Sequence, residues 1–396
     1  MIRITWHSVM LRGYNKGMQV TYLPYLHMLK HPEMDFPDLN IKVWNYGACK
    51  DKYISDANTK SILDALMASN VYHGRSIDDM GIISIGNIDF REFTQDERAL
   101  CNEVRILLFA GALFWGALSD PGPNKGHHMT TSENFDAVWQ NFSLEDNGRM
   151  GIVSGSIVVK RDMGYRVSDL LFNRPEYVPT PTQFRGNDDI IKLLLRLRKR
   201  QKRLYRRIMS ALEIVMQAYY NDIKVPESAR ILLMASAYEM LFDLPEDSQR
   251  KILKEKFKEL FVLKSDPKRR YKSARPKGGF VIEEESIKVM WVDQFYSLRN
   301  LIIHGGKVKN SNYMFLNKQR QLDISILFFA LGVKKIASQC RGFSETHNSI
   351  EWKKHTEPGE SKDSDFNYEA FVYEDLDPFI AITRRLFRNK YKNNRT

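Results

Sequence analysis

The residues with the clearest chemical potential lie in the segment 294–306, which reads QFYSLRNLIIHGG. Three of its side chains have the chemistry to bind or cleave a phosphodiester: Arg299, Asn300 and His304. A guanidinium stays charged and donates a planar fork of hydrogen bonds to phosphate oxygens. An imidazole can accept or donate a proton near neutral pH. A permanent cation and a titratable base this close in sequence are therefore suited to act on one phosphodiester.

The same segment has the pattern of a helix that ends at its glycines. Four apolar residues recur at steps of three and four, the period of one helix face: Phe295, Leu298, Leu301 and Ile302. Gly305 and Gly306 suit a helix C-cap, because glycine readily accepts the left-handed conformation there. We therefore expect a helix over 283–304, with His304 at its last position.

The composition is that of a basic globular protein with room for two domains. The chain has 396 residues, a hydrophobic content of 43% and a net charge of +12. Such an excess of positive charge favours a polyanionic partner, most simply nucleic acid, although charge alone does not specify one. A basic protein without such a partner has the same composition.

The cysteines and apolar segments exclude several classes of protein. Three widely spaced cysteines fit neither a zinc ribbon nor a disulfide scaffold, and they favour a reducing, cytoplasmic setting. The first ten residues lack the charged and apolar regions of a signal peptide. The longest apolar run, 106–118, contains two glycines and is too short to cross a bilayer. We therefore expect no membrane partner.

Residues 1–187 predict an α+β domain of unknown role, which could sense a trigger or restrain the rest of the chain. β-branched and alternating segments predict strands, at 3–11, 19–22, 81–90 and 151–161. Apolar periodicity predicts helices, at 56–69 and 94–118. The segment 173–187 holds three prolines and is expected to be a linker.

From residue 188 the pattern becomes helical, which predicts an all-α bundle over 188–340. The expected helices are 188–221, 227–244, 246–263, 283–304 and 316–339. The helix 227–244 is apolar nearly all round, so it should lie at the centre of the bundle. The segment 264–279 is expected to be a basic loop, and residues 341–396 a polar tail with a terminal basic helix.

The segment around Arg299 resembles the signature of the HEPN superfamily. That signature is a helix bearing arginine, a polar neighbour and, four to six residues on, histidine, here Arg299, Asn300 and His304. Tyr296 precedes it and a glycine follows it. The helix 227–244 resembles the second HEPN helix, whose acidic residue is matched by Glu239. The spacing of the two helices, with a basic insert between them, resembles the Apea-like HEPN branch.

The resemblance covers residues 188–340 and implies a metal-independent endoribonuclease without a cofactor. In that family two motif helices face each other in a homodimer and form one composite site. His304 would be the general base or acid, Arg299 would stabilise negative charge at phosphorus, and Asn300 would bind phosphate or orient the imidazole. The products would carry a 2′,3′-cyclic phosphate and a 5′-hydroxyl.

Apea-like HEPN proteins are toxins or antiviral (phage) defence effectors that cut cellular RNA, so the resemblance implies such a role for this chain, with tRNA or mRNA as the substrate. An antitoxin or a trigger protein is then a possible partner. The alternative is a non-catalytic HEPN dimer that binds RNA, a nucleotide or a partner protein.

Supporting roles are expected for Glu239 and Tyr296. A carboxylate in an apolar helix is costly unless paired, so Glu239 should pair with Arg299. That pair would hold the bundle in register, aim Arg299 at the phosphate, or do both.

Two basic stretches, 192–207 and 264–277, are candidate RNA-binding surfaces, although each is as readily explained as a solvated face. The candidate residues are Arg200, Arg203, Arg207, Arg269, Arg270 and Tyr271. Tyr205 and Tyr271 lie within these stretches, where they could stack on bases.

Short motifs also arise by chance. Arg341 and His347 also match an arginine followed closely by a histidine, but they lie in a segment without helical periodicity, and we discount them. His127 and His128 lack partners at metal-ligand spacing, so no metal site is predicted.

Overall fold

The computed structural model describes residues 18–27, 32–72, 75–77, 80–86, 90–91, 93–119, 132–144, 150–153, 172–173, 186, 188–220, 225–262, 266, 268–274, 279–316 and 319–338. The strand expected at 3–11 and the tail at 341–396 lie outside these residues, as does most of the expected linker. The chain divides into two compact units, 1–105 with 133–184, and 106–132 with 185–396. The division therefore falls within one helix, α3 (Gln95–Ser119), whereas the sequence predicted a single boundary near 187.

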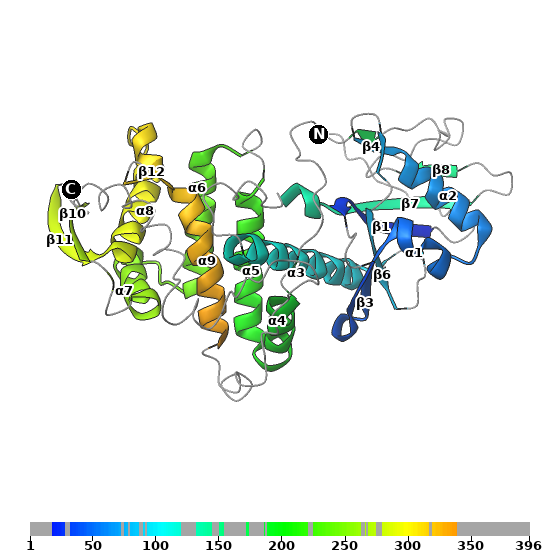
Figure 1. Ribbon diagram of the computed structural model, residues 1–396, viewed down its shortest axis with the longest axis horizontal. Helices are drawn as coiled ribbons and strands as arrows, with labels where there is room; N and C mark the ends of the chain where they lie inside the picture. The colour runs from blue at the N-terminus through cyan, green and yellow to red at the C-terminus, as the bar shows by residue number, and fades with distance from the viewer. Residues whose placement is uncertain are drawn as a thin grey trace, which may run out of the picture. The chain divides into compact units, whose positions relative to one another are not determined.

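The first unit is built on a six-stranded sheet in the order β2-β3-β6-β1-β7-β8 (Figure 1). All five strand pairs in it are antiparallel. Its strands are β1 (Met18–His27), β2 (Glu33–Phe36), β3 (Ile41–Asn45), β6 (Met80–Ile85), β7 (Val138–Leu144) and β8 (Met150–Val153). A small second sheet contains β4 (Asn70–Tyr72), β5 (Arg75–Ser76) and β9 (Phe172–Asn173). The α+β class predicted for this part of the chain is confirmed.

Helices α1 (Tyr46–Tyr53) and α2 (Ala57–Ala68) cover one face of this sheet. Tyr22, Ile82 and Trp44 pair across three neighbouring strands, so they lie in one row on the same face. They pack with the buried α2 residues Leu63 and Leu66. This layer of apolar side chains forms the core of the unit.

The helix α3 begins where the sequence predicted. The Thr94 hydroxyl accepts a hydrogen bond from the Glu97 amide at 3.3 Å, and the Glu97 carboxylate accepts one from the Thr94 amide at 2.9 Å. This reciprocal pair is a capping box, which satisfies two amides at a helix start.

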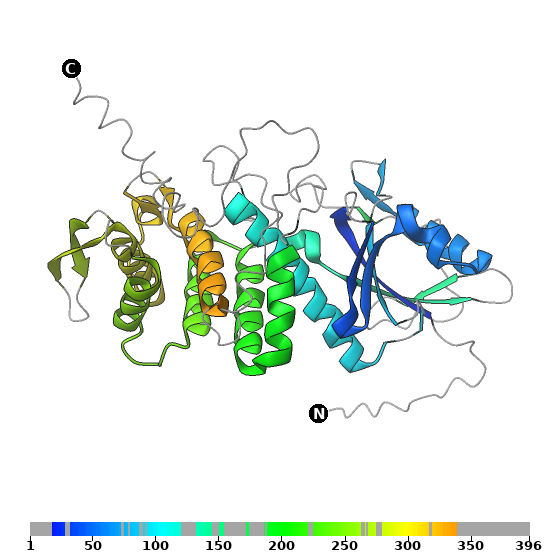
Figure 2. The ribbon, with the colours of Figure 1, turned by 60° about the horizontal axis from the view of Figure 1, so that its bottom comes forward.

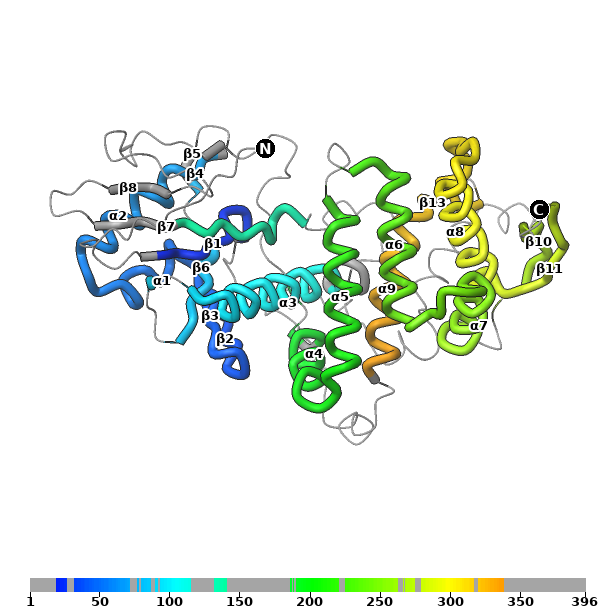
Figure 3. The backbone as a smooth tube through the Cα atoms, turned by 180° about the vertical axis from the view of Figure 1, so that it is seen from behind, coloured from blue at the N-terminus to red at the C-terminus, as the bar shows by residue number. Residues whose placement is uncertain are grey.

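The second unit is mostly helical. Its further helices are α4 (Asp188–Arg200), α5 (Lys202–Ala218), α6 (Glu227–Phe242), α7 (Gln249–Phe261), α8 (Ile287–Ile303) and α9 (Gln321–Ser338). Helix α6 contacts α5, α7, α8 and α9 (Figure 3), so the central position predicted for it is correct. The Tyr238 ring on α6 is fully buried and lies near the rings of Phe257, Trp291 and Phe329, one from each of three neighbouring helices.

The second unit is not all-α, because the basic insert is a β-hairpin. Strand β10 (Lys268–Ala274) pairs with β11 (Phe280–Ser286), as Figure 2 shows beside the helices. The predicted loop and the predicted start of the helix at 283 were therefore wrong. Alternation between exposed and buried residues, KRRYKSA and FVIEEES, is the period of a strand. A 3-10 turn (Asn310–Tyr313) and the short strands β12 (Met314–Phe315) and β13 (Gln319–Arg320) precede α9.

The helix expected over 188–221 is broken at Gln201, whose φ of −141° and ψ of 64° are not helical. Like charges at helical spacing disfavour a continuous helix here, for example at Lys199 and Arg203. The predicted single helix is thus two, α4 and α5. Among the residues that the structure describes, no helix is long and apolar enough to cross a membrane.

Candidate active site

Helix α8 carries the arginine, asparagine and histidine that the sequence singled out. The Ser286 hydroxyl caps its start by accepting from the Val289 amide at 3.3 Å. At its end, the Gly305 amide donates to Ile302 at 3.1 Å and the Gly306 amide to Leu301 at 2.9 Å. Gly305 has a φ of +65°, so this is a Schellman cap that needs glycine. The predicted C-cap is confirmed, and it fixes the backbone on both sides of His304.

Arg299 is held by a set of side chains from two helices. Its Nη2 lies 3.0 Å from Glu239 Oε1 on α6. Its Nη1 donates to the Asn300 side-chain oxygen at 3.0 Å. Its Cζ also lies 5.1 Å from the centroid of the Tyr296 ring. The guanidinium is therefore oriented by a carboxylate, an amide and an aromatic face, while about a fifth of the side chain stays exposed.

Tyr296 connects this set to α7. Its hydroxyl oxygen lies 2.5 Å from Glu239 Oε1 and 2.6 Å from Gln249 Oε1. A hydroxyl carries one proton, so it donates to the carboxylate, and the amide donates to the phenol oxygen when its O and N positions are exchanged. Burial and the hydrogen bond to Glu239 raise the pKa of Tyr296. The phenol thus stays protonated and braces Glu239.

Gln249 is a member of the cluster that sequence reasoning missed. It is the first residue of α7 and comes from a polar segment without periodicity. Only the packing of α7 against α8 brings it to Tyr296. No local signal in the sequence could have identified it.

His304 is exposed at the end of α8, where a ligand can reach its ring. It follows Asn300 by one helical turn, so the two residues share a helix face. Arg299 is one residue before Asn300, and its Nη1 donates to the Asn300 side-chain oxygen. Asn300 therefore contacts the guanidinium and also shares a helix face with His304.

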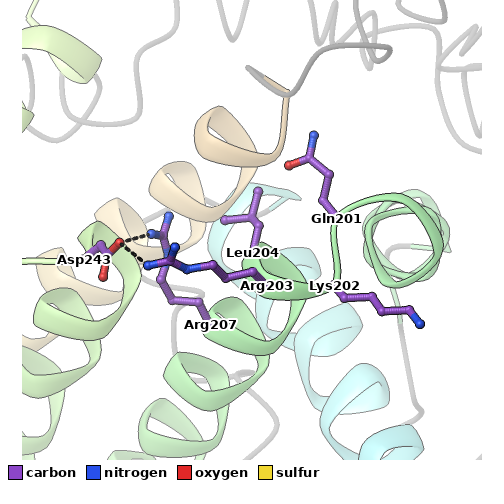
Figure 4. Close-up of a pocket in the computed structure, with 6 residues that line it drawn as sticks. All are labelled: Gln201, Lys202, Arg203, Leu204, Arg207 and Asp243. Carbon is purple, nitrogen blue, oxygen red and sulfur yellow. Dashed lines mark hydrogen bonds and ion pairs between the residues drawn. The ribbon is translucent and has the colours of Figure 1, made fainter.

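The first basic stretch lines a pocket of about 560 Å³ at the break between α4 and α5 (Figure 4). Arg207 Nη1 lies 2.8 Å and Arg203 Nη2 4.0 Å from the same Asp243 oxygen. Figure 4 shows Lys202 pointing away from this group. One carboxylate faces both guanidiniums, so it balances at most one of their two positive charges and the pocket stays positively charged. Arg200 is exposed but does not line the pocket.

The two tyrosines proposed to stack on bases are not available for that role. Tyr205 is only 6% exposed and Tyr271 only 7% exposed. The Tyr271 hydroxyl donates to Glu283 on the neighbouring strand β11 at 3.1 Å. Their neighbours Arg269 and Arg270 lie on β10, with Arg270 exposed and paired with Glu284 at 3.0 Å. The stacking prediction was wrong because Tyr205 lies on the buried side of helix α5, and Tyr271 lies on the inward side of strand β10, where alternate residues point inward.

The described residues contain no group of three or more His, Cys, Asp or Glu placed to hold a metal ion. Comparison of the chain with family models, curated proteins and solved structures found no match. The function is therefore argued from the site itself.

Proposed function

We propose that this protein is a metal-independent endoribonuclease of the HEPN type, whose active site is formed by Arg299, Asn300 and His304. The observation that carries the proposal is the bracing of Arg299 by Glu239 and Tyr296, on the helix that ends in the exposed His304. About a fifth of the Arg299 side chain is exposed, so its ion pair with Glu239 leaves the guanidinium accessible to a phosphate. The HEPN-like arrangement of the helices is part of this proposal.

The reaction follows from the chemistry of RNA, which carries its own nucleophile. The 2′-oxygen attacks the adjacent phosphorus and forms a new P–O bond while its proton passes to a base. The bond from phosphorus to the 5′-oxygen breaks, and that oxygen receives a proton. Arg299 stabilises the charge that grows on the phosphoryl oxygens, and His304 transfers a proton. The products are a 2′,3′-cyclic phosphate and a 5′-hydroxyl.

The proposal includes a homodimer, because the reaction needs both a base and an acid. Each chain offers one histidine at this site, so two chains would supply the pair. Two of the exposed large apolar side chains in the described residues, Met240 on α6 and Ile303 next to His304, belong to the helices that carry the cluster. We propose that these two side chains take part in the contact between the two copies.

The test is cleavage of total tRNA and of mRNA in EDTA, with analysis of the end groups. We expect wild-type protein to leave 2′,3′-cyclic phosphates, and Arg299→Ala to lower the rate by about 10²–10³-fold, as removal of a charge-stabilising donor does. Arg320→Ala, at an exposed arginine in β13, is the matched control and should cleave like wild type. Equal cleavage rates for Arg299→Ala and Arg320→Ala would show that Arg299 takes no part in the reaction.

Glu239 is proposed as a positioning residue. Glu239→Gln keeps the size of the side chain and a bond to Tyr296 but removes the charge that holds Arg299. We expect the cleavage rate constant to fall about tenfold, since a charge-assisted hydrogen bond contributes roughly 1.5–3 kcal/mol, while the KM for RNA stays near its wild-type value. A lower melting temperature with unchanged cleavage would show that the pair serves the fold alone.

The proposed biological role is that of a toxin or an antiviral defence effector. Its substrate would be cellular tRNA or mRNA, and an antitoxin or trigger protein would regulate it. Expression of the wild-type gene should then arrest growth, and expression of the Arg299→Ala gene should not. A phenotype that survives loss of the active-site residues would instead identify a binding module.

A further inference from the structure

The outer face of the β10–β11 hairpin is unusual because it combines exposed apolar side chains with cations. Four large apolar side chains are exposed among the described residues, and two of them lie on β11: Phe280 is 55% exposed and Ile282 is 65% exposed. On β10, Lys268, Arg270 and Lys272 are all exposed. Side chains two apart on a strand share a face, so these cations form a row about 7 Å apart along it.

The hairpin is anchored to the helices through residues of its other face. The Ser273 hydroxyl donates to buried Asp293 on α8 at 2.8 Å. Arg250 on α7 donates to the carbonyl of Ala274 at 2.6 Å. The hydroxyl of Tyr271 is bonded to Glu283 on the facing strand. These contacts fix the orientation of the strands, so the outer side chains are presented by a rigid support.

Cation and aromatic ring lie together on the outer face. The Lys272 Nζ is 4.4 Å from the centroid of the Phe280 ring. Lys272 is paired with Ile282 across the strands, and Arg270 with Glu284. Glu284 accepts a hydrogen bond from Arg270 at 3.0 Å, so its charge is compensated there. The face therefore keeps net positive charge beside two exposed apolar groups.

We propose that the outer face of the β10–β11 hairpin binds single-stranded RNA. A base stacks on the side of the Phe280 ring away from Lys272, with Ile282 extending the apolar contact, while Lys268 and Lys272 contact backbone phosphates. Aromatic rings that stack on bases, beside cations that follow the backbone, are the general means by which proteins hold single strands. A duplex does not fit as well, because its bases are already stacked and paired.

The choice of RNA as the occupant rests on the proposed ribonuclease function and on the charge of the chain. A row of evenly spaced cations on one strand suits a regular polyanion better than a folded protein surface. The net charge of +12 adds a general attraction for such a polymer. The hairpin would hold the substrate strand outside the site of cleavage.

The test measures binding of wild-type protein to a fluorescent single-stranded 2′-O-methyl RNA by anisotropy at several salt concentrations. This probe lacks the nucleophile, so binding is read without cleavage. We expect Phe280→Ala to weaken binding about tenfold with an unchanged salt dependence, since the loss of one stacked base costs about 1–3 kcal/mol. Lys272→Ala should lower the slope of log K against log salt by about 0.7, the value for one phosphate contact to a single strand.

The control is Lys251→Ala, which removes an exposed lysine from α7 and should leave affinity and slope unchanged. Wild-type affinity in both hairpin variants, or no binding of the probe, would overturn the inference. Binding of a duplex as tight as that of the single strand would overturn the stacking role of Phe280. Binding of the 2′-O-methyl probe is measured independently of RNA cleavage in EDTA. Failure of the proposed ribonuclease function can therefore be distinguished from failure of RNA binding at the hairpin.

Discussion

Replacement of His304 by alanine is expected to lower the rate of RNA cleavage by about 10²–10⁴-fold, the usual contribution of a general acid or base. The imidazole is the exposed titratable group of the cluster, whereas Glu239 is engaged by Arg299 and Tyr296. The loss should appear in the rate constant rather than in RNA affinity, because Arg299 and Asn300 remain to bind phosphate. Single-turnover cleavage of a labelled oligoribonucleotide in EDTA measures it.

The matched control for this change is His347→Ala. Arg341 and His347 repeat the arginine-to-histidine pattern in a segment without helical periodicity, so this variant should cleave like wild type. His304 is exposed, and its removal should leave the melting temperature unchanged. Full cleavage by a folded His304→Ala protein would exclude His304 as the proton carrier.

The helix that carries the candidate site could be predicted because its signals are local. The apolar steps from Phe295 to Ile302 and the glycines after His304 define one helix and its end without any knowledge of the rest of the chain. The pairing of Glu239 with Arg299 could also be expected, since a carboxylate in an apolar helix needs a partner. The structure has that pair, at 3.0 Å.

The hairpin could not be predicted in the same way, because its pairing is set by distant contacts. Prolines, glycines and many cations between 264 and 279 indicated a loop, yet Ser273 and Tyr271 face inward to partners on α8 and β11. The same packing buries Tyr271 and exposes Phe280. It also brings Gln249 to Tyr296, although these residues lie 47 positions apart.

Asp293 is expected to contribute most to the stability of the second unit, because it is a buried charge with several partners. Its side chain is 1% exposed and accepts hydrogen bonds from Arg250 at 2.8 and 2.9 Å and from Ser273 at 2.8 Å. Lys254 lies 3.4 Å away. Asp293→Asn should lower the free energy of unfolding by about 3 kcal/mol, since it leaves the poorly solvated Arg250 without its counter-charge, whereas Lys254 keeps its pair with Glu283. Urea denaturation followed by tryptophan fluorescence measures the change.

The effect of this substitution should depend on pH in one direction. Burial alone would raise the pKa of Asp293, but the bonds from Arg250 and Ser273 outweigh it and hold that pKa below its usual value. The unfolded chain therefore binds the proton more readily than the folded one, and the stabilisation is fully present above an ordinary aspartate pKa of about 3.9. It is lost as the pH falls through the lower folded value, so the difference between wild type and Asp293→Asn should narrow below about pH 4.

Glu284→Gln is the matched control for this pH dependence. Glu284 pairs with Arg270 on the β10–β11 hairpin, to which Asp293 is bonded through Ser273, but the Glu284–Arg270 pair is solvent-exposed. An exposed pair contributes about 0–1 kcal/mol, so Glu284→Gln should stay within that range of wild type at every pH. A loss of equal size in both variants would show that Asp293 is no more than a surface charge. A difference between wild type and Asp293→Asn that stays constant down to pH 3 would show that its carboxylate is not linked to folding.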